Sequence, residues 1–115
     1  MLLDCTLFPD LIVVHVRDSR IDAAGAIDFK DRMRELTQAD TRRVMLDLSR
    51  VVFIDSSGLG AVVAVRKSLG PDRPLELAAL TPAVAKVFRL TRMDSVFLIH
   101  AAAPGTVDGS LHDAI

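Results

Sequence analysis

The sequence has no tryptophan, no tyrosine and only five phenylalanines among its 115 residues. Proteins that bind single-stranded nucleic acids stack the bases on aromatic side chains, and this chain offers few such platforms. Its 14 basic and 15 acidic residues nearly cancel, to a net charge of −1, and they are spread along the chain. Because nucleic acids and anionic lipids attract a basic patch, direct binding to either is disfavoured.

Only one cysteine, Cys5, is present, so an intramolecular disulfide is excluded. It lies in an apolar segment and is predicted to be a buried small hydrophobe, which suits a reducing cytoplasm. One cysteine and three scattered histidines do not form the ligand cluster that a metal site needs. Neither a metal nor a cofactor is therefore predicted.

Long hydrophobic runs are missing as well. The longest uninterrupted apolar stretches have about five residues, far fewer than a membrane span requires. The start, Met1–Asp4, lacks the basic and apolar regions of a secretion signal. With 50% hydrophobic and 25% charged residues, the chain is expected to fold as one domain over residues 1–115 and to remain in the cytoplasm, without insertion into a membrane.

The hydrophobic pattern predicts an α/β fold. Residues 2–8 and 11–16 are β-like runs on either side of Pro9-Asp10, which indicates an opening hairpin. Residues 18–22 read as a polar loop, and the last half-dozen residues allow a short C-terminal helix. The order β-β-α-β-α-β-α-β predicts a mixed β-sheet, opened by the hairpin and continued through helical crossovers. The expected helices span 23–37, 57–69 and 82–90, and the further strands span 44–48, 51–54, 75–79 and 97–101.

The chemically richest stretch is Asp-Ser-Ser-Gly-Leu-Gly at 55–60, where a strand passes into a helix. The first N–H groups of a helix have no internal partner, and the helix dipole makes that end partly positive. Asp55 or Ser56 either simply caps the helix, for about 1 kcal/mol, or forms part of a displayed functional site. Gly58 and Gly60 each weaken the first turn by up to about 1 kcal/mol, which indicates a close approach there by the sheet backbone or by another protein.

Enzyme templates fail at this junction, and no enzymatic activity is predicted. A nucleophile elbow needs a glycine two residues before and two residues after its serine, and neither Ser56 nor Ser57 has both. The motif of a phosphate-binding loop is absent from the sequence. Nor does the spacing of the histidines nominate a catalytic base; they stand at His15, His100 and His112.

The run from 44 to 69, centred on Leu-Asp-Leu-Ser-Arg-Val-Val-Phe-Ile-Asp-Ser-Ser-Gly-Leu-Gly, resembles the signature of the STAS domain. In particular, it is similar to the free-standing anti-sigma factor antagonists of bacteria. The hairpin, the loop that ends at Ile21-Asp22, the segment Leu-Thr-Pro-Ala-Val at 80–84 and the helix around 87–90 resemble the same family in order and spacing. The resemblance covers about residues 5–101 and implies the STAS fold.

The resemblance also implies a function. The serine after the motif aspartate, here Ser56, would be phosphorylated by a partner that is both a serine kinase and an anti-sigma factor. Asp55 would cap the helix and position that hydroxyl. The unphosphorylated protein would bind the anti-sigma factor and release a sigma factor, and a PP2C-type phosphatase would reset the switch. The contact surface implied by the motif comprises Ser57, Gly58, Leu59 and Gly60.

Two further positions carry alternatives. Asp22 matches the acidic residue that ends the family's usual Gly-Glu-Leu-Asp loop, near the partner interface, but it could equally cap the first helix. Arg66 either contacts an acidic partner or lies at a solvated helix end. The family's Gly and Glu are replaced by Ser19-Arg20, which reverses the charge beside Asp22 and would alter partner choice. A second function stays open, namely a STAS scaffold or accessory subunit of a stress-signalling complex or lipid transporter that phosphorylation does not switch.

Overall fold

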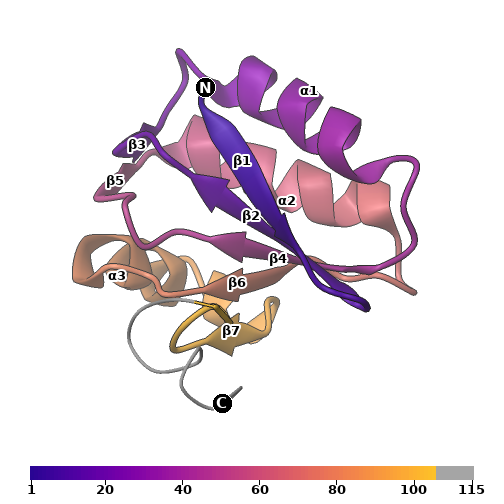
Figure 1. Ribbon diagram of the computed structural model, residues 1–115. Coiled ribbons are helices and arrows are strands. Elements are labelled where there is room, and N and C mark those ends of the chain that lie inside the picture. The colour runs from indigo at the N-terminus through magenta and orange to yellow at the C-terminus, as the bar shows by residue number, and fades with distance from the viewer. Residues whose placement is uncertain (106–115) are drawn as a thin grey trace.

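The fold opens with the predicted hairpin. The computed structural model describes residues 1–105. Strands β1 (Leu3–Leu7) and β2 (Leu11–Val16) pair antiparallel across the Pro9-Asp10 turn. The strands that follow join β2 in parallel, so the mixed five-stranded sheet has the order β1-β2-β4-β6-β7 (Figure 1). These further strands are β4 (Arg43–Asp47), β6 (Glu76–Ala78) and β7 (Ile99–His100).

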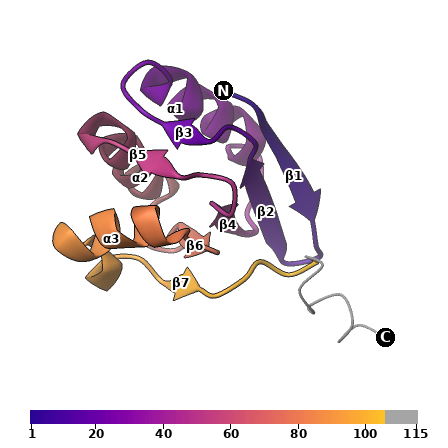
Figure 2. The same ribbon diagram turned by 90° about the vertical axis from the view of Figure 1, so that its left-hand side faces the viewer.

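Three α-helices of the described chain lie on one side of the sheet (Figure 2). They are α1 (Ala26–Thr37), α2 (Ser56–Leu69) and α3 (Pro82–Leu90). The core between sheet and helices is aliphatic with a few phenylalanines, as the composition requires. Its fully buried members include Phe29 of α1, Val62 of α2 and Phe88 of α3. The predicted α/β class with a hairpin and helical crossovers is confirmed.

The opposite face of the sheet, here called the helix-free face, carries a smaller apolar cluster. Alternate residues of the strands point to it, and Ala103 and Phe8 pack on it from beyond the strands. Strand β2 is therefore buried on both faces, which explains its nearly continuous apolar sequence. The buried members of this cluster are Leu11, Val13, Met45, Ala78 and Ala103.

The strand expected over 51–54 is shorter in the structure. Only β5 (Phe53–Ile54) is a strand, and it pairs in parallel with β3 (Arg20–Ile21) in a separate two-stranded sheet. The sequence reading takes residues 18–22 as a loop, because a strand of two residues is too short to leave a periodic signal. The pairing of β3 with β5 brings the chain before α1 beside the chain before α2, and this builds the candidate site.

The first helix begins later than predicted, and Asp22 does not cap it. Helix α1 starts at Ala26, and its N-cap residue is Gly25, which makes no side-chain capping bond. The Asp22 carbonyl instead accepts a hydrogen bond from Gly25 N–H at 3.1 Å, which closes a turn. Residues 23–25 of the expected helix therefore form part of the connection between β3 and α1.

The end of the described chain also differs from the prediction. A 3₁₀ helix at Met93–Ser95 precedes the last strand, which is limited to Ile99–His100. Phe97 leaves the sheet to pack edge-to-face on Phe88, with 5.8 Å between ring centroids. The predicted C-terminal helix lies outside the described residues. None of the helices between residues 1 and 105 combines the length and apolar character needed to cross a bilayer.

The expectation that Cys5 is buried is wrong. Cys5 is exposed in the middle of β1, the edge strand of the sheet. Within β1 only Leu3 is buried, and it belongs to the core between the sheet and the helices. An apolar sequence segment predicted a strand correctly, but the burial of each residue depends on how far its neighbours extend over it.

Candidate functional site

Asp55 organises the junction between β5 and α2. It is the N-cap of α2, and its Oδ1 accepts a hydrogen bond from Gly58 N–H at 2.8 Å. Its Oδ2 accepts a second one from Ala23 N–H at 3.1 Å, in the connection between β3 and α1. One carboxylate thus fixes both the start of α2 and the loop beside it. The sequence allowed either Asp55 or Ser56 as the helix cap, and in the structure the cap is Asp55.

Ser56 and Ser57 open α2, and both are exposed. Within residues 1–105, neither hydroxyl takes part in a hydrogen bond, since Asp55 already performs the capping. The hydroxyls therefore stand free in solvent at the partly positive end of a helix of 14 residues. Such a position can accept an added anionic group without disturbing internal bonds.

The two glycines of the motif have different surroundings. A Cβ at the buried Gly58 would lie 2.0 Å from the carbonyl oxygen of Ile21 and 2.7 Å from its carbonyl carbon. A Cβ at the exposed Gly60 would meet nothing within 4 Å. The close approach at Gly58 is therefore made by the backbone of β3. Gly58 lies beneath the surface, while Gly60 presents bare helix backbone and Leu59 is half-buried.

Arg20 and Asp22 form the rim beside this junction. Arg20 Nε donates to Asp22 Oδ2 at 3.0 Å, and the guanidinium carbon lies 4.1 Å from the centre of the Phe53 ring. This bond from Arg20 lowers the pKa of Asp22 below its ordinary value. Phe53 is 40% exposed and its neighbour Val52 is 57% exposed. The sequence singled out neither of these two, because an apolar run before a helix predicts burial.

Arg66 does not join the residues around Ser56. It lies ten positions further along α2, about 15 Å at the rise of an α-helix. Its guanidinium carbon lies 5.8 Å from the Phe97 ring centre, and its Nε is buried without a hydrogen bond. The side chain is half-buried and packs on Phe97, so it is not a solvated helix end, and its contact with an acidic partner stays a prediction.

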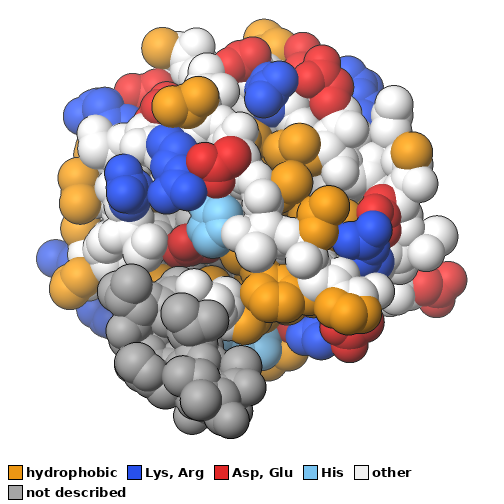
Figure 3. Space-filling model, viewed as in Figure 1, with side chains coloured by type: hydrophobic (Ala, Val, Ile, Leu, Met, Phe, Trp, Pro, Cys, Tyr) orange, Lys and Arg blue, Asp and Glu red, His pale blue; other side chains and the backbone are white. Residues whose placement is uncertain are grey.

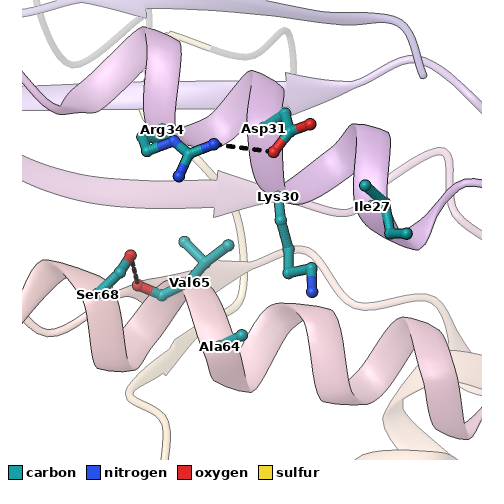
Figure 4. Close-up of a pocket in the computed structure, with 7 residues that line it drawn as sticks. All are labelled: Ile27, Lys30, Asp31, Arg34, Ala64, Val65 and Ser68. Atoms are coloured by element: carbon teal, nitrogen blue, oxygen red, sulfur yellow. Dashed lines mark hydrogen bonds and ion pairs between the residues drawn. The ribbon is translucent and has the colours of Figure 1, made fainter.

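A shallow hollow of about 450 Å³ lies between α1 and α2. Figure 4 shows Lys30 reaching from α1 toward α2 across this hollow, while Arg34 turns to Asp31, to which it donates at 2.9 Å. Ala64, Val65 and Ser68 form the α2 wall. Ala64 lies eight residues beyond Ser56, or about 12 Å along the helix. The hollow therefore contains no residue of the predicted site.

A hydrogen-bonded chain that the sequence did not reveal crosses the helix-free face. His15 Nδ1 lies 2.7 Å from Asp47 Oδ2, and His15 Nε2 lies 2.9 Å from Thr6 Oγ1. Figure 3 shows this face, with a histidine among acidic and basic side chains beside an apolar patch. The three residues come from three adjacent strands, so only the strand register unites them. The network ties the hairpin to β4.

Glu76 is the centre of a second network on the same face. Its carboxylate accepts two hydrogen bonds from Arg43, at 2.8 and 3.0 Å, and lies 2.8 Å from His100 Nε2. The side chain is only 7% exposed. The hydrogen bonds from Arg43 hold the pKa of Glu76 below its ordinary value, against the opposing effect of burial.

We expect Glu76→Gln to lower the free energy of unfolding by about 2 kcal/mol at pH 7, because Arg43 loses its charged acceptor. A carboxyl whose pKa is lowered by folding stabilises the protein above its unfolded pKa, and this contribution is lost as pH falls through the folded value. The gap between wild type and variant should therefore close below about pH 4. Urea unfolding at pH 7 and at lower pH measures this difference in free energy of unfolding. The exposed Glu35→Gln is the control, and a gap that does not change with pH would contradict this assignment.

Comparison with known proteins agrees with this architecture. The family model described as STAS domain matches residues 5–114. A STAS-domain containing protein of Pseudomonas aeruginosa is 30% identical over 81 residues, which cover 70% of this chain and 79% of that protein. BtrV of Bordetella bronchiseptica, whose name assigns it provisionally to the anti-sigma factor antagonists, is 33% identical over 78 residues, 67% of each chain.

Solved structures share the fold at lower identity. An anti-sigma-factor antagonist (STAS) domain protein of Planctomyces limnophilus superposes with a TM-score of 0.79 at 19% identity, covering 98% of both chains. The Bacillus cell fate determinant SpoIIAA, solved in its phosphorylated form, gives a TM-score of 0.64 at 16% identity, covering 99% of this chain and 100% of that one. This chain therefore belongs to the STAS domain family and is related to anti-sigma factor antagonists.

Proposed function

We propose that this chain is an anti-sigma factor antagonist that works as a binding switch. In its unphosphorylated form it docks on an anti-sigma factor and so releases a sigma factor. The anti-sigma factor, acting as a serine kinase, phosphorylates Ser56 and ends the docking, and a PP2C-type phosphatase restores it. The observation that carries this proposal is the free, exposed Ser56 hydroxyl at the start of α2, beside the cap Asp55.

The proposed docking surface surrounds that hydroxyl. Ser57 and Gly60 are exposed, and the missing side chain of Gly60 lets a partner approach the helix backbone closely. Leu59 is half-buried at its edge, and Asp55 holds the surface in shape through its two hydrogen bonds. Gly58 contributes from below, by allowing α2 to lie against β3. The chain itself would bind and would not catalyse a reaction.

The rim beside the docking surface is proposed to select the partner. Asp22 is held by Arg20, which also lies over the exposed Phe53 ring. The resemblance to the family implies a glutamate at the position of Arg20, so the charge beside Asp22 would be reversed in this chain. A partner that fits this rim is therefore expected to present an acidic group opposite Arg20.

Phosphorylation can change binding without unfolding the domain. A phosphoserine adds a charge of about −1.5 to −2 at pH 7 and three acceptor oxygens. In the free protein, the N-terminus of α2 stabilises that charge, and solvent surrounds it. In a docked complex, the same charge would be removed from water next to the carboxylate of Asp55, which costs free energy. The switch therefore acts on the complex rather than on the fold.

To test this proposal, the wild-type chain is used to capture its partner from the native cell. ATP is then added, and the intact mass of the chain is measured. Wild type is expected to gain one phosphoryl group. Ser56→Ala should still capture the partner but gain none, because the acceptor hydroxyl is missing. Ser68→Ala, on the far end of α2, is the control and should be modified like wild type. Equal phosphorylation of wild type and Ser56→Ala would overturn the site, and recovery with a membrane transporter, unmodified, would favour the accessory-subunit role.

A further inference from the structure

Strand β1 has a free edge. Within residues 1–105 it pairs only with β2, and Figure 2 shows it as the outermost strand on the right. Arg17 N–H donates to the Leu2 carbonyl at 2.9 Å, and Phe8 N–H donates to the Leu11 carbonyl at 2.8 Å. The even-numbered residues of β1 therefore direct their backbone groups inward to β2. Because this direction alternates along a strand, Leu3, Cys5 and Leu7 direct theirs outward.

The usual protection of an edge strand is missing here. Proteins blunt such edges with a proline, a lysine, a bulge or a very short strand. β1 has five residues in unbroken register with β2, and none of them is proline or lysine. Its one charge, Asp4, is neutralised by Arg17, which donates to both carboxylate oxygens at 2.8 and 3.0 Å. The edge thus offers uncharged backbone donors and acceptors beside the exposed Cys5 and the 60% exposed Leu7.

We propose that this edge pairs with β1 of a second copy of the chain, antiparallel, about a two-fold axis at Cys5. The backbone register then matches every outward residue with an outward residue, since Cys5 faces Cys5 of the other copy and Leu3 faces its Leu7. Asp4 faces a threonine hydroxyl, Thr6 of the other copy. Centring the pair on Asp4 would instead set two carboxylates opposite each other, which destabilises a sheet.

The side chains are complementary in the same register. Leu7, 60% exposed in one copy, packs beside Leu3 of the other, and Leu2, 64% exposed, comes opposite Phe8. Cross-strand apolar pairs of this kind are the unit of sheet stabilisation. The two five-stranded sheets become one continuous sheet. In Figures 1 and 2, β5, which leads into Ser56, lies apart from β1.

Light scattering after size-exclusion chromatography, under reducing conditions and at several concentrations, tests the pairing. The mass should rise with concentration from 12.5 kDa toward twice that value. Leu7→Lys puts a charge at the proposed interface but at an exposed position of the monomer. It should raise the dissociation constant at least about tenfold, with an unchanged melting temperature at concentrations where both proteins are monomeric. Leu90→Lys, at a 70% exposed position of α3, is the matched control and should dimerise like wild type.

Cross-linking reports the register directly. Residues in a hydrogen-bonded antiparallel pair have Cα atoms about 5.5 Å apart, within the range of a disulfide. Mild oxidation with copper phenanthroline should therefore join two wild-type copies through Cys5. The double variant Cys5→Ser, Ser68→Cys carries its thiol on α2 and should stay unlinked. The proposal is overturned if the wild-type mass stays at 12.5 kDa, or if a dimer forms that Leu7→Lys does not weaken and Cys5 does not link.

Discussion

Replacement of Gly58 by alanine is expected to lower the free energy of unfolding by about 3 kcal/mol, the upper part of the usual range for overpacking. The added Cβ would lie 2.0 Å from the carbonyl oxygen of Ile21. That oxygen belongs to the backbone of β3, which is held by pairing with β5, so it cannot rotate aside as a side chain would. Either α2 moves away from β3 or the small sheet breaks.

The matched control is Gly60→Ala, two residues further along the same turn. A Cβ there meets nothing within 4 Å, so the variant should gain up to about 1 kcal/mol from the better helix propensity of alanine. Urea unfolding of the three proteins gives both values, with the slope checked for a common unfolded state. Equal effects of the two substitutions would show that α2 does not lie against β3 as described.

Gly58→Ala should also disturb the candidate site around Asp55. Asp55 Oδ1 accepts from Gly58 N–H while its Oδ2 accepts from Ala23 N–H, so a shift of α2 separates two donors that one carboxylate now joins. The loop before α1 would lose its anchor at the same time. Gly58 is buried, so it contributes to the proposed docking surface by fixing the position of α2.

The sequence predicted the elements with the strongest local signals. The apolar runs at 11–16 and 44–48 are strands, and proline and glycine mark the start of α3 and the end of α2. It also marked both glycines of the motif as unusual for a helix. It could not tell which of them meets the sheet backbone, because Ile21 lies 37 positions before Gly58 and reaches it only through the pairing of β3 with β5.

The features that the sequence missed share that dependence on distant contacts. Asp22 is a good capping residue locally, yet Arg20 and the turn at Gly25 engage it instead. His15 reads as one polar residue in an apolar strand until the register sets it beside Asp47. Local chemistry therefore identified which groups are present, and only the fold decided which of them meet.

Substitution of Ser56 by aspartate is expected to weaken binding to the proposed anti-sigma factor partner roughly a hundredfold, which corresponds to about 3 kcal/mol. The new carboxylate would stand beside Asp55 in a surface that loses water on docking, so the complex bears two neighbouring charges without counterions. In the free protein the helix dipole favours an acidic residue in the first turn, so the melting temperature should hardly change. A large drop in melting temperature would instead assign Ser56 a structural role.

Titration calorimetry with the captured anti-sigma factor measures this loss. Ser68→Asp adds the same charge to the same helix, about 18 Å from Ser56, and should bind like wild type. The comparison separates the position of the charge from the net charge of the chain, which both variants change equally. The effect at Ser56 should also survive added salt, because a charge desolvated in an interface is screened far less than an exposed one. Equal weakening by both variants, or loss of the difference in salt, would contradict a switch located at the start of α2.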